Sequence, residues 1–383
     1  MKNFSLYCAK FLITSYTSIL APLLPLLILQ MKLSLTQAGA LVSLFSLFNS
    51  LLQPLFGWAQ DRIGYSLFLC FAPLWVGSFM GATGLAPNFG WLIVFLLLAG
   101  TGICAFHPAS FTAVGGVGPD RRAVVISFLL FAAALGFVLG PSLISLFVSR
   151  FGMEKLYLIS LPGIAATFLL YKTILPKRNE APREMGRALY PAKTILTPIL
   201  PFFAFVLMIS ITAMNLYSFV PIFFREKGIS VGMIGFFLSA FALGCAIGPL
   251  LGSLMARRCG RLKTLVLSVG SSIVLLLIFL PAQGAPICEI FVLLLLGISL
   301  MFPFSVLIDM AQEKVPQYLG TVSSLLGGFA WGCGGVLVIF FARVAEAVGV
   351  EKVLGGLSLL PLINLGLVFA APSFRSGKAG NKM

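Results

Sequence analysis

The sequence has 383 residues, of which 59% are hydrophobic and only 10% are charged, and its formal net charge is +15. A soluble domain carries about 25% charged residues, so this chain has too few charges to cover its own surface in water. We therefore expect lipid to be its solvent. Its basic residues stand between apolar runs, which indicates membrane topology and argues against nucleic-acid binding.

Twelve apolar runs follow one another along the chain, each long enough to cross about 30 Å of hydrocarbon as a helix. Helices are expected because lipid offers the backbone no hydrogen-bond partners. The first run is too long for a cleaved signal peptide. The fold class predicted is therefore an all-α membrane protein. The predicted spans cover residues 5–29, 36–58, 66–86, 91–114, 123–148, 155–175, 196–223, 231–256, 263–282, 287–310, 320–345 and 351–371.

Lysine and arginine residues are distributed unequally between the two sides of these spans. If the N-terminus is cytoplasmic, 19 of the 26 basic residues fall on the cytoplasmic side, a count that includes Lys10. The positive-inside rule then predicts an inner-membrane protein with both termini in the cytoplasm. The long polar segment near the middle divides the chain into a six-helix half at 1–175, a cytoplasmic linker at 176–194 and a six-helix half at 195–383 with a short cytoplasmic tail.

An internal repeat supports two halves. The three matching pairs, all offset by 195 residues, are Pro54 with Pro249, Gly57 with Gly252, and Pro108 with Pro303. Because each half has an even number of spans, the repeat is parallel and its axis lies along the membrane normal. The two prolines inside spans 4 and 10, Pro108 and Pro303, are predicted to bend their helices.

A polar motif after span 2 contains Gly57, Asp61, Arg62 and Gly64. The first glycine lets neighbouring helices approach closely. The aspartate near a helix end can pair with a basic group or a helix N-terminus and hold the cytoplasmic side closed. An ordinary polar loop is the alternative. The second half has Ala256 where the acid would stand, so only the first half is expected to carry this latch.

Two further motifs lie inside spans. In span 5, Gly136 and Gly140 form a small-residue face for close packing, and Pro141 follows directly. Simple helix packing and an antiport-specific role are both consistent with this pattern. Span 4 contains Gly-Thr-Gly-Ile-Cys-Ala-Phe-His-Pro at residues 100–108.

Together these motifs resemble known transporters. The loop after span 2 is similar to the signature of the major facilitator superfamily, and the span 5 segment resembles part of its antiporter signature. The span 4 stretch is similar to the fosmidomycin-resistance branch of drug exporters. This resemblance implies a monomeric transporter without a cofactor, with a small-molecule substrate, protons and membrane lipid as partners. It also implies a central cavity lined mainly by spans 1, 4, 7 and 10.

His107 is the only histidine of the chain and lies within span 4. Pro108 removes a backbone donor and frees the carbonyl of Cys104, so this stretch needs a protein or water partner. A titratable imidazole in a span predicts a functional site. A neutral histidine that only packs is the alternative. No acidic residue lies near the middle of a span, and no lysine or arginine is clearly midplane, so His107 is the candidate proton carrier.

Other polar or aromatic residues of the spans could contact an amphipathic solute. They are Tyr16, Ser110, Asn215, Tyr217, Phe302 and Ser305. The function predicted is export of a small amphipathic compound by proton antiport, and uptake of a small metabolite is the alternative. An intramembrane enzyme is not expected, because the chain has one histidine, no carboxylate near the middle of a span and no HExxH motif. A non-transporting receptor would not need the repeat. The seven cysteines are expected to pack as small apolar residues, with no metal.

Overall fold

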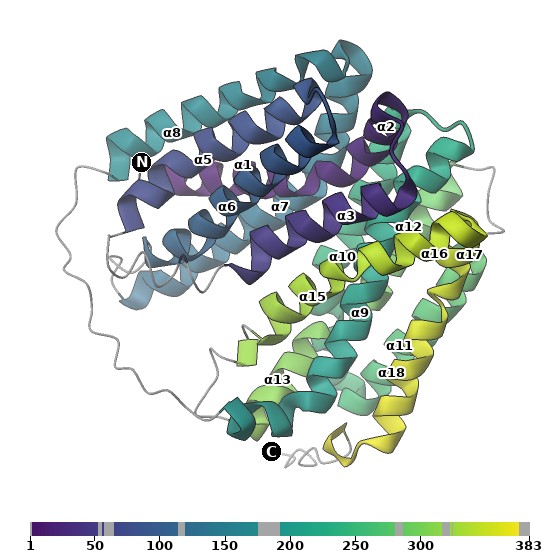
Figure 1. Ribbon diagram of the computed structural model, residues 1–383. Helices are drawn as coiled ribbons and strands as arrows, with labels where there is room; N and C mark the ends of the chain where they lie inside the picture. Colours follow the sequence, from purple (N-terminus) through teal and green to yellow (C-terminus); the bar gives the residue numbers. More distant parts are fainter. Residues whose placement is uncertain are drawn as a thin grey trace. The chain divides into compact units, whose positions relative to one another are not determined.

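The computed structural model describes residues 2–52, 56, 65–113, 119–174, 192–279, 286–315, 322–323 and 325–374. Within these ranges the backbone is helical apart from short connections, and no strand occurs (Figure 1). Ten stretches are long and apolar enough to cross a membrane, and a shorter apolar helix covers Leu69–Leu85. The span predicted at 36–58 is helical over Leu35–Leu51. The predicted all-α membrane fold with twelve spans is therefore confirmed.

Two sets of predicted features lie outside the described residues. One is the polar motif after span 2, together with the proline that precedes it: Pro54, Gly57, Asp61, Arg62 and Gly64. The other is the linker up to residue 191. The helix that follows the linker begins at Ala192, which lies within the range predicted for the linker.

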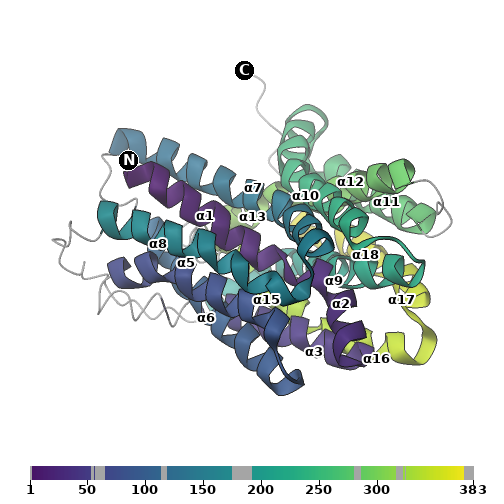
Figure 2. The ribbon, with the colours of Figure 1, turned by 90° about the horizontal axis from the view of Figure 1, so that it is seen from above.

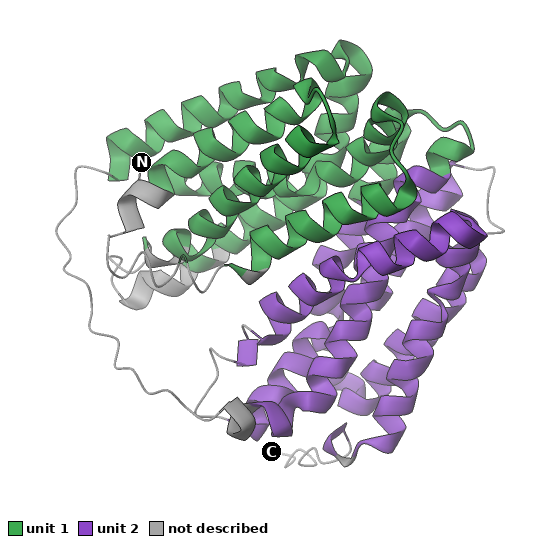
Figure 3. Cartoon of the chain, viewed as in Figure 1, with its two compact units in different colours: residues 1–187, 224–239 green, residues 188–223, 240–383 purple. Residues whose placement is uncertain are grey.

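The chain divides into two compact units (Figure 3). Unit 1 is Met1–Arg187 with Phe224–Ser239, and unit 2 is Ala188–Phe223 with Ala240–Met383. The end of the seventh span and the start of the eighth thus group with unit 1. The division into halves at 175 and 195 stays a prediction.

Unit 1 is built around its first helix. Its elements are α1 (Lys2–Ser18), α2 (Leu20–Met31), α3 (Leu35–Ser46), η1 (Leu47–Leu51), α5 (Tyr65–Ala82), η2 (Thr83–Leu85), α6 (Phe89–Thr112), α7 (Pro119–Phe151), η3 (Met153–Ile159) and α8 (Ser160–Ile174). Helix α1 contacts α5, α6, α7 and α8, and α5 runs beside α8 in both ribbon views (Figures 1 and 2). Most described side chains of α1 are therefore buried or half-buried, and Phe4 near its start is exposed.

The first span is divided at Ile19, between α1 and α2. Pro22 has no N–H for the carbonyl of Ser18, and its ring crowds that carbonyl, so the helix cannot continue unchanged. The hydroxyl of Ser18 donates to the carbonyl of Ser15 at 2.8 Å. A hydroxyl thus supplies part of the hydrogen bonding at the break.

Glycines of α7 bring it close to α1. A Cβ added at Gly136 would overlap the carbonyl oxygen of Phe11, and one added at Gly140 would overlap the hydroxyl of Ser18. The predicted small-residue face of span 5 is therefore a contact surface for span 1. Pro141 follows within α7, which continues as a helix.

Unit 2 contains most of the last six spans. Its elements are α9 (Ala192–Glu226), α10 (Val231–Cys259), α11 (Arg261–Phe279), α12 (Pro286–Met301), α13 (Phe304–Lys314), η6 (Leu325–Phe329), α15 (Ala330–Val336), α16 (Val338–Val348), α17 (Val350–Gly356), α18 (Leu359–Ala370) and η7 (Pro372–Phe374). Helix α10 approaches α12 through Gly244, Gly248 and Gly252, where an added Cβ would crowd the carbonyls of Leu294, Ile298 and Phe302.

The two prolines predicted to bend helices differ in effect. Pro303 interrupts span 10: α12 ends at Met301 and α13 begins at Phe304. The carbonyl of Ser299, which Pro303 cannot serve, accepts a hydrogen bond from the Ser268 hydroxyl at 2.6 Å. By contrast, α6 continues as a helix through Pro108.

Substituting Gly136 tests the α1–α7 contact. Gly136→Ala is expected to destabilise the protein by about 1–3 kcal/mol, because the new methyl group overlaps the Phe11 carbonyl. The matched control is Gly270→Ala in α11, where an added Cβ meets no described atom within 4 Å. That control should be neutral or stabilising, because alanine favours a helix over glycine by about 1 kcal/mol. The measurement is the melting temperature in detergent, and equal values for the two variants would contradict the contact.

Candidate functional site

The candidate site in unit 1 contains a buried lysine, Lys10, which the sequence alone did not indicate as a functional residue. Its side chain is only 2% exposed, although it lies inside the apolar span Phe4–Met31. The position is about 9 Å along the helix from Phe4, at 1.5 Å per residue. Lys10, which was counted among the cytoplasmic basic residues, lies in the packed interior of unit 1 and not in a loop, and the side of the membrane to which it belongs stays a prediction.

The Lys10 ammonium reaches two side chains of α6. Its Nζ lies 2.8 Å from Nδ1 of His107 and donates to Oγ of Ser110 at 3.3 Å. It also lies 5.7 Å from the ring centroid of Phe106, within the range of a cation–π contact. Two predicted site residues, His107 and Ser110, are therefore brought together by a third residue from another span.

The contact between Nζ and Nδ1 requires one acid and one base. An ammonium only donates, whereas a neutral imidazole offers one donor and one acceptor nitrogen. Protonated Lys10 with neutral His107 and neutral Lys10 with protonated His107 contain the same number of protons. The Lys10–His107 pair can therefore hold one shared proton, and the two forms differ only in where the proton resides.

The two members of the pair differ in access. Lys10 is enclosed, whereas His107 keeps part of its surface exposed. His107 is three residues before Ser110, where its span ends, so the pair lies toward one end of spans 1 and 4. The Ser110 hydroxyl donates to the carbonyl of His107 at 2.7 Å, which fixes the α6 turn around the imidazole. His107 is thus the route by which a proton could reach the pair.

Tyr16, a predicted substrate contact, is a packing residue in this structure. It is 4% exposed, and its hydroxyl donates to the carbonyl of Ile159 at 2.5 Å. A Cβ added at Gly77 would come within 2.9 Å of the same hydroxyl oxygen. Tyr16 therefore ties α1 to the start of α8 and fills the space left by a glycine of α5.

The predicted site residues of unit 2 lie on two elements. Asn215 of α9 is buried and its Nδ2 donates to the carbonyl of Ile211 at 2.8 Å, while its Oδ1 has no partner among the described residues. Tyr217, also on α9, lies 6.5 Å from Phe241 between ring centroids. A contact of Asn215 or Tyr217 with substrate therefore stays a prediction.

Ser305 and Phe302 lie around the break in span 10. The Ser305 hydroxyl donates to the carbonyl of Pro249 at 2.9 Å, and Phe302 lies in the turn between α12 and α13, where its carbonyl faces Gly252. Both residues hold α10 against the broken span. Any contact of theirs with substrate stays a prediction.

An ion cluster joins the start of α11 to α13 in unit 2. Arg261, the first residue of α11, contacts Asp309 at 2.6 Å and binds both carboxylate oxygens of Glu313 at 2.6 and 2.7 Å. In the second-half copy of the polar motif, Ala256 stands where the first half has an aspartate. The acids that pair with Arg261 come instead from α13, 48 and 52 residues later in the chain. A motif of neighbouring residues therefore cannot predict this ion cluster.

The sequence profile of the Major Facilitator Superfamily matches residues 6–374. The chain belongs to this superfamily. It is therefore a membrane transporter by family and fold.

Two relatives with drug-resistance names are similar over most of the chain. The fosmidomycin resistance protein of Escherichia coli (strain K12) is 26% identical over 363 residues, covering 92% of this chain and 88% of the relative. A multi-drug resistance efflux pump PmrA homolog of Lactococcus lactis subsp. lactis (strain IL1403) is 24% identical over 384 residues, covering 97% and 86%. The predicted resemblance to fosmidomycin-resistance proteins is thereby confirmed.

Solved structures of other Major Facilitator transporters share the fold. A bacterial homologue of the human lysosomal transporter Spinster, inward-facing and occupied, has a TM-score of 0.81 at 15% identity, covering 98% of this chain and 96% of that one. A D-xylose–proton symporter has a TM-score of 0.73 at 13% identity, covering 98% of each chain. At these identities the likeness shows the fold alone.

The packing role of Tyr16 can be separated from a substrate role. Tyr16→Phe should destabilise the protein by about 1–2 kcal/mol, because the Ile159 carbonyl loses its donor. Transport per folded molecule should be unchanged. The control is Tyr7→Phe on the same helix, since no hydrogen bond of the Tyr7 hydroxyl occurs within the described residues. If Tyr16→Phe binds substrate more weakly at an unchanged melting temperature, Tyr16 contacts the substrate and the packing role is contradicted.

Proposed function

We propose that this Major Facilitator transporter exports a small amphipathic compound in exchange for protons. The observation that carries the proposal is the contact at 2.8 Å between Lys10 and His107, inside unit 1. Among the described residues it joins a buried ammonium to the chain's single histidine. The names of the two relatives support export.

The Lys10–His107 pair supplies a proton site without a carboxylate. His107 has an unperturbed pKa of about 6.5, so an imidazole can change charge near physiological pH. When His107 takes a proton from the accessible side, its Nδ1 can no longer accept from the Lys10 ammonium. A second proton on the pair therefore breaks the hydrogen bond between α1 and α6, because Lys10 and His107 are then both donors.

That change at the α1–α6 contact can drive alternating access. Loading and unloading of the proton would favour different arrangements of α1 relative to α6, so that each proton state stabilises one access state. Substrate and proton need not share a site if each favours a different access state. The exchange of the two solutes then follows from the reciprocal coupling of their binding.

Uptake by proton symport is the second candidate function. The D-xylose–proton symporter has the same fold, and a shared proton does not by itself encode the direction of transport. The direction is decided by whether substrate binding favours the protonated or the deprotonated pair. Transport in vesicles of known orientation distinguishes the two, because an inward proton gradient drives export of the compound by antiport but its uptake by symport.

The proposed location is the inner membrane with both termini in the cytoplasm. The excess of 19 basic residues over 7 supports this orientation. It places Lys10 and His107 toward the cytoplasmic end of their spans. Labelling of single cysteines near either terminus by an impermeant reagent in intact cells would contradict it.

Replacing His107 tests the proton role. His107→Gln can still accept from the Lys10 ammonium, but it cannot carry a proton. We expect pH-driven uphill transport to fall to background while downhill exchange of the same compound continues. The measurement is transport into proteoliposomes over pH 5.5 to 8.5, with a drug panel that begins with fosmidomycin.

The control for this variant is Thr14→Val. Thr14 lies one turn from Lys10 on α1, and its hydroxyl donates to the carbonyl of that residue. This substitution removes a polar group from the helix that carries Lys10, but it removes no titratable group. Uphill transport by His107→Gln at the rate of the control would overturn the proton-coupling proposal, and loss of downhill exchange would assign His107 to substrate binding instead.

A further inference from the structure

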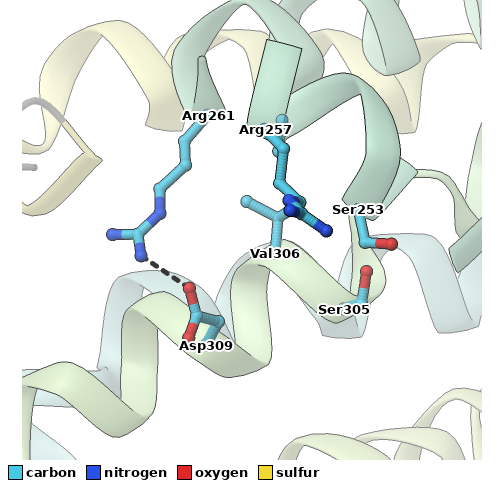
Figure 4. Close-up of a pocket in the computed structure, with 7 residues that line it drawn as sticks. Ser253, Arg257, Arg261, Ser305, Val306 and Asp309 are labelled. Carbon is cyan, nitrogen blue, oxygen red and sulfur yellow. Dashed lines mark hydrogen bonds and ion pairs between the residues drawn. The ribbon is translucent and has the colours of Figure 1, made fainter. Parts of the chain in front are cut away.

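A pocket of about 340 Å³, lined by polar and apolar groups, opens at the end of unit 2 where α10 meets α11 and α13. This volume is typical of sites for small molecules. The lining residues are Ser253, Ala256, Arg257, Arg261, Ser305, Val306 and Asp309. Figure 4 shows Ser253 and Ser305 facing one another, with Arg257 beside them and Arg261 joined to Asp309.

The two arginines of this pocket differ in their partners. Arg261 contacts two carboxylates, those of Asp309 and Glu313, so this cluster carries one negative charge in excess. Arg257 is exposed and forms no hydrogen bond or ion pair within the described part of the chain. The pocket therefore presents one guanidinium whose N–H groups have no partner among the described residues, and such a group binds phosphate oxygens through paired N–H donors.

Other features near the pocket also favour an anion. Helix α11 begins at Arg261, a residue of the pocket, and the start of a helix carries a partial positive charge that favours anions. Arg258 and Lys263 stand on the same stretch but do not line the pocket. The acids of the neighbouring α13, Asp309 and Glu313, are both engaged by Arg261.

The surface beside the pocket is apolar. Leu250 and Leu254 of α10 are 66% and 53% exposed, and Leu262 of α11 is 40% exposed. In a membrane protein such leucines face acyl chains, and here Leu254 and Leu262 directly follow the pocket residues Ser253 and Arg261 in the chain. A ligand with a phosphate group and hydrocarbon chains matches both surfaces, whereas free phosphate matches only the pocket.

We propose that this pocket binds the phosphate group of an anionic phospholipid, with Arg257 as its principal ligand and the exposed leucines of α10 and α11 against its acyl chains. The hydroxyls of Ser253 and Ser305 donate to helix carbonyls and keep the floor of the pocket polar. With the predicted orientation, the lipid belongs to the cytoplasmic leaflet. The lipid would then anchor the junction of α10, α11 and α13.

The experiment measures stabilisation of the purified full-length chain in detergent by added ligands. The probes are dioctanoyl phosphatidylglycerol, dioctanoyl phosphatidylcholine and inorganic phosphate, and the readout is the melting temperature. The variants are Arg257→Gln, Arg257→Lys and the matched control Arg258→Gln, which removes a neighbouring charge that does not line the pocket. Melting temperatures without ligand establish that each variant is folded.

We expect phosphatidylglycerol to stabilise the wild-type protein more than phosphatidylcholine does. The Arg257→Gln variant should need about tenfold more phosphatidylglycerol to reach half of the maximal increase in melting temperature, since a charge-assisted hydrogen bond is lost. Arg257→Lys should fall between, and Arg258→Gln should match the wild type. Equal losses in Arg257→Gln and Arg258→Gln would indicate diffuse surface attraction and overturn the site. Stabilisation by phosphate alone equal to that by phosphatidylglycerol would overturn the lipid assignment.

If Arg257→Gln proves unfolded, Arg257→Lys decides the question. An unchanged response of Arg257→Lys to phosphatidylglycerol contradicts paired hydrogen bonding by the guanidinium, and a weakened response supports it. Binding is measured without transport, so these outcomes do not depend on the proposed proton exchange.

Discussion

An ammonium group in the interior of a lipid-solvated helix bundle must be bonded to protein, and this constraint organises unit 1. Removing such a charge from water is costly unless hydrogen bonds replace its hydration. Lys10 meets the requirement through His107 and Ser110 of α6. The contact can form only because α1 lies among α5, α6, α7 and α8, with Gly136 of α7 against its backbone. Close packing and the charged contact therefore depend on each other.

The same constraint acts on the backbone wherever a helix is disturbed. The Ser268 hydroxyl serves the carbonyl that Pro303 leaves open, and the Ser305 hydroxyl serves the carbonyl of Pro249. In the continuous helix α6, the Ser110 hydroxyl donates to the carbonyl of His107. Serines thus supply donors that water supplies in a soluble protein.

The sequence predicted the spans well because hydrocarbon imposes a minimum length of apolar helix on each of them. It predicted His107 because a single histidine within a span stands out. It missed Lys10 because a lysine near the start of a span counts toward topology, and its partner lies 97 residues away. The Arg261 cluster was missed for the same reason, since its acids come from a span that follows later. Contacts between spans are decided by packing, which hydropathy does not describe.

The central claim is that Lys10 and His107 share a hydrogen bond and a proton, and the chain offers a direct test. Because it has one histidine, labelling with ¹⁵N-histidine gives the imidazole signals of His107 alone, provided that the purification tag contains no histidine. We predict an Nδ1 chemical shift typical of a hydrogen-bond acceptor, which Lys10→Met returns to that of a free imidazole. Spectra and titration curves that are identical in the wild-type and Lys10→Met proteins would contradict the account.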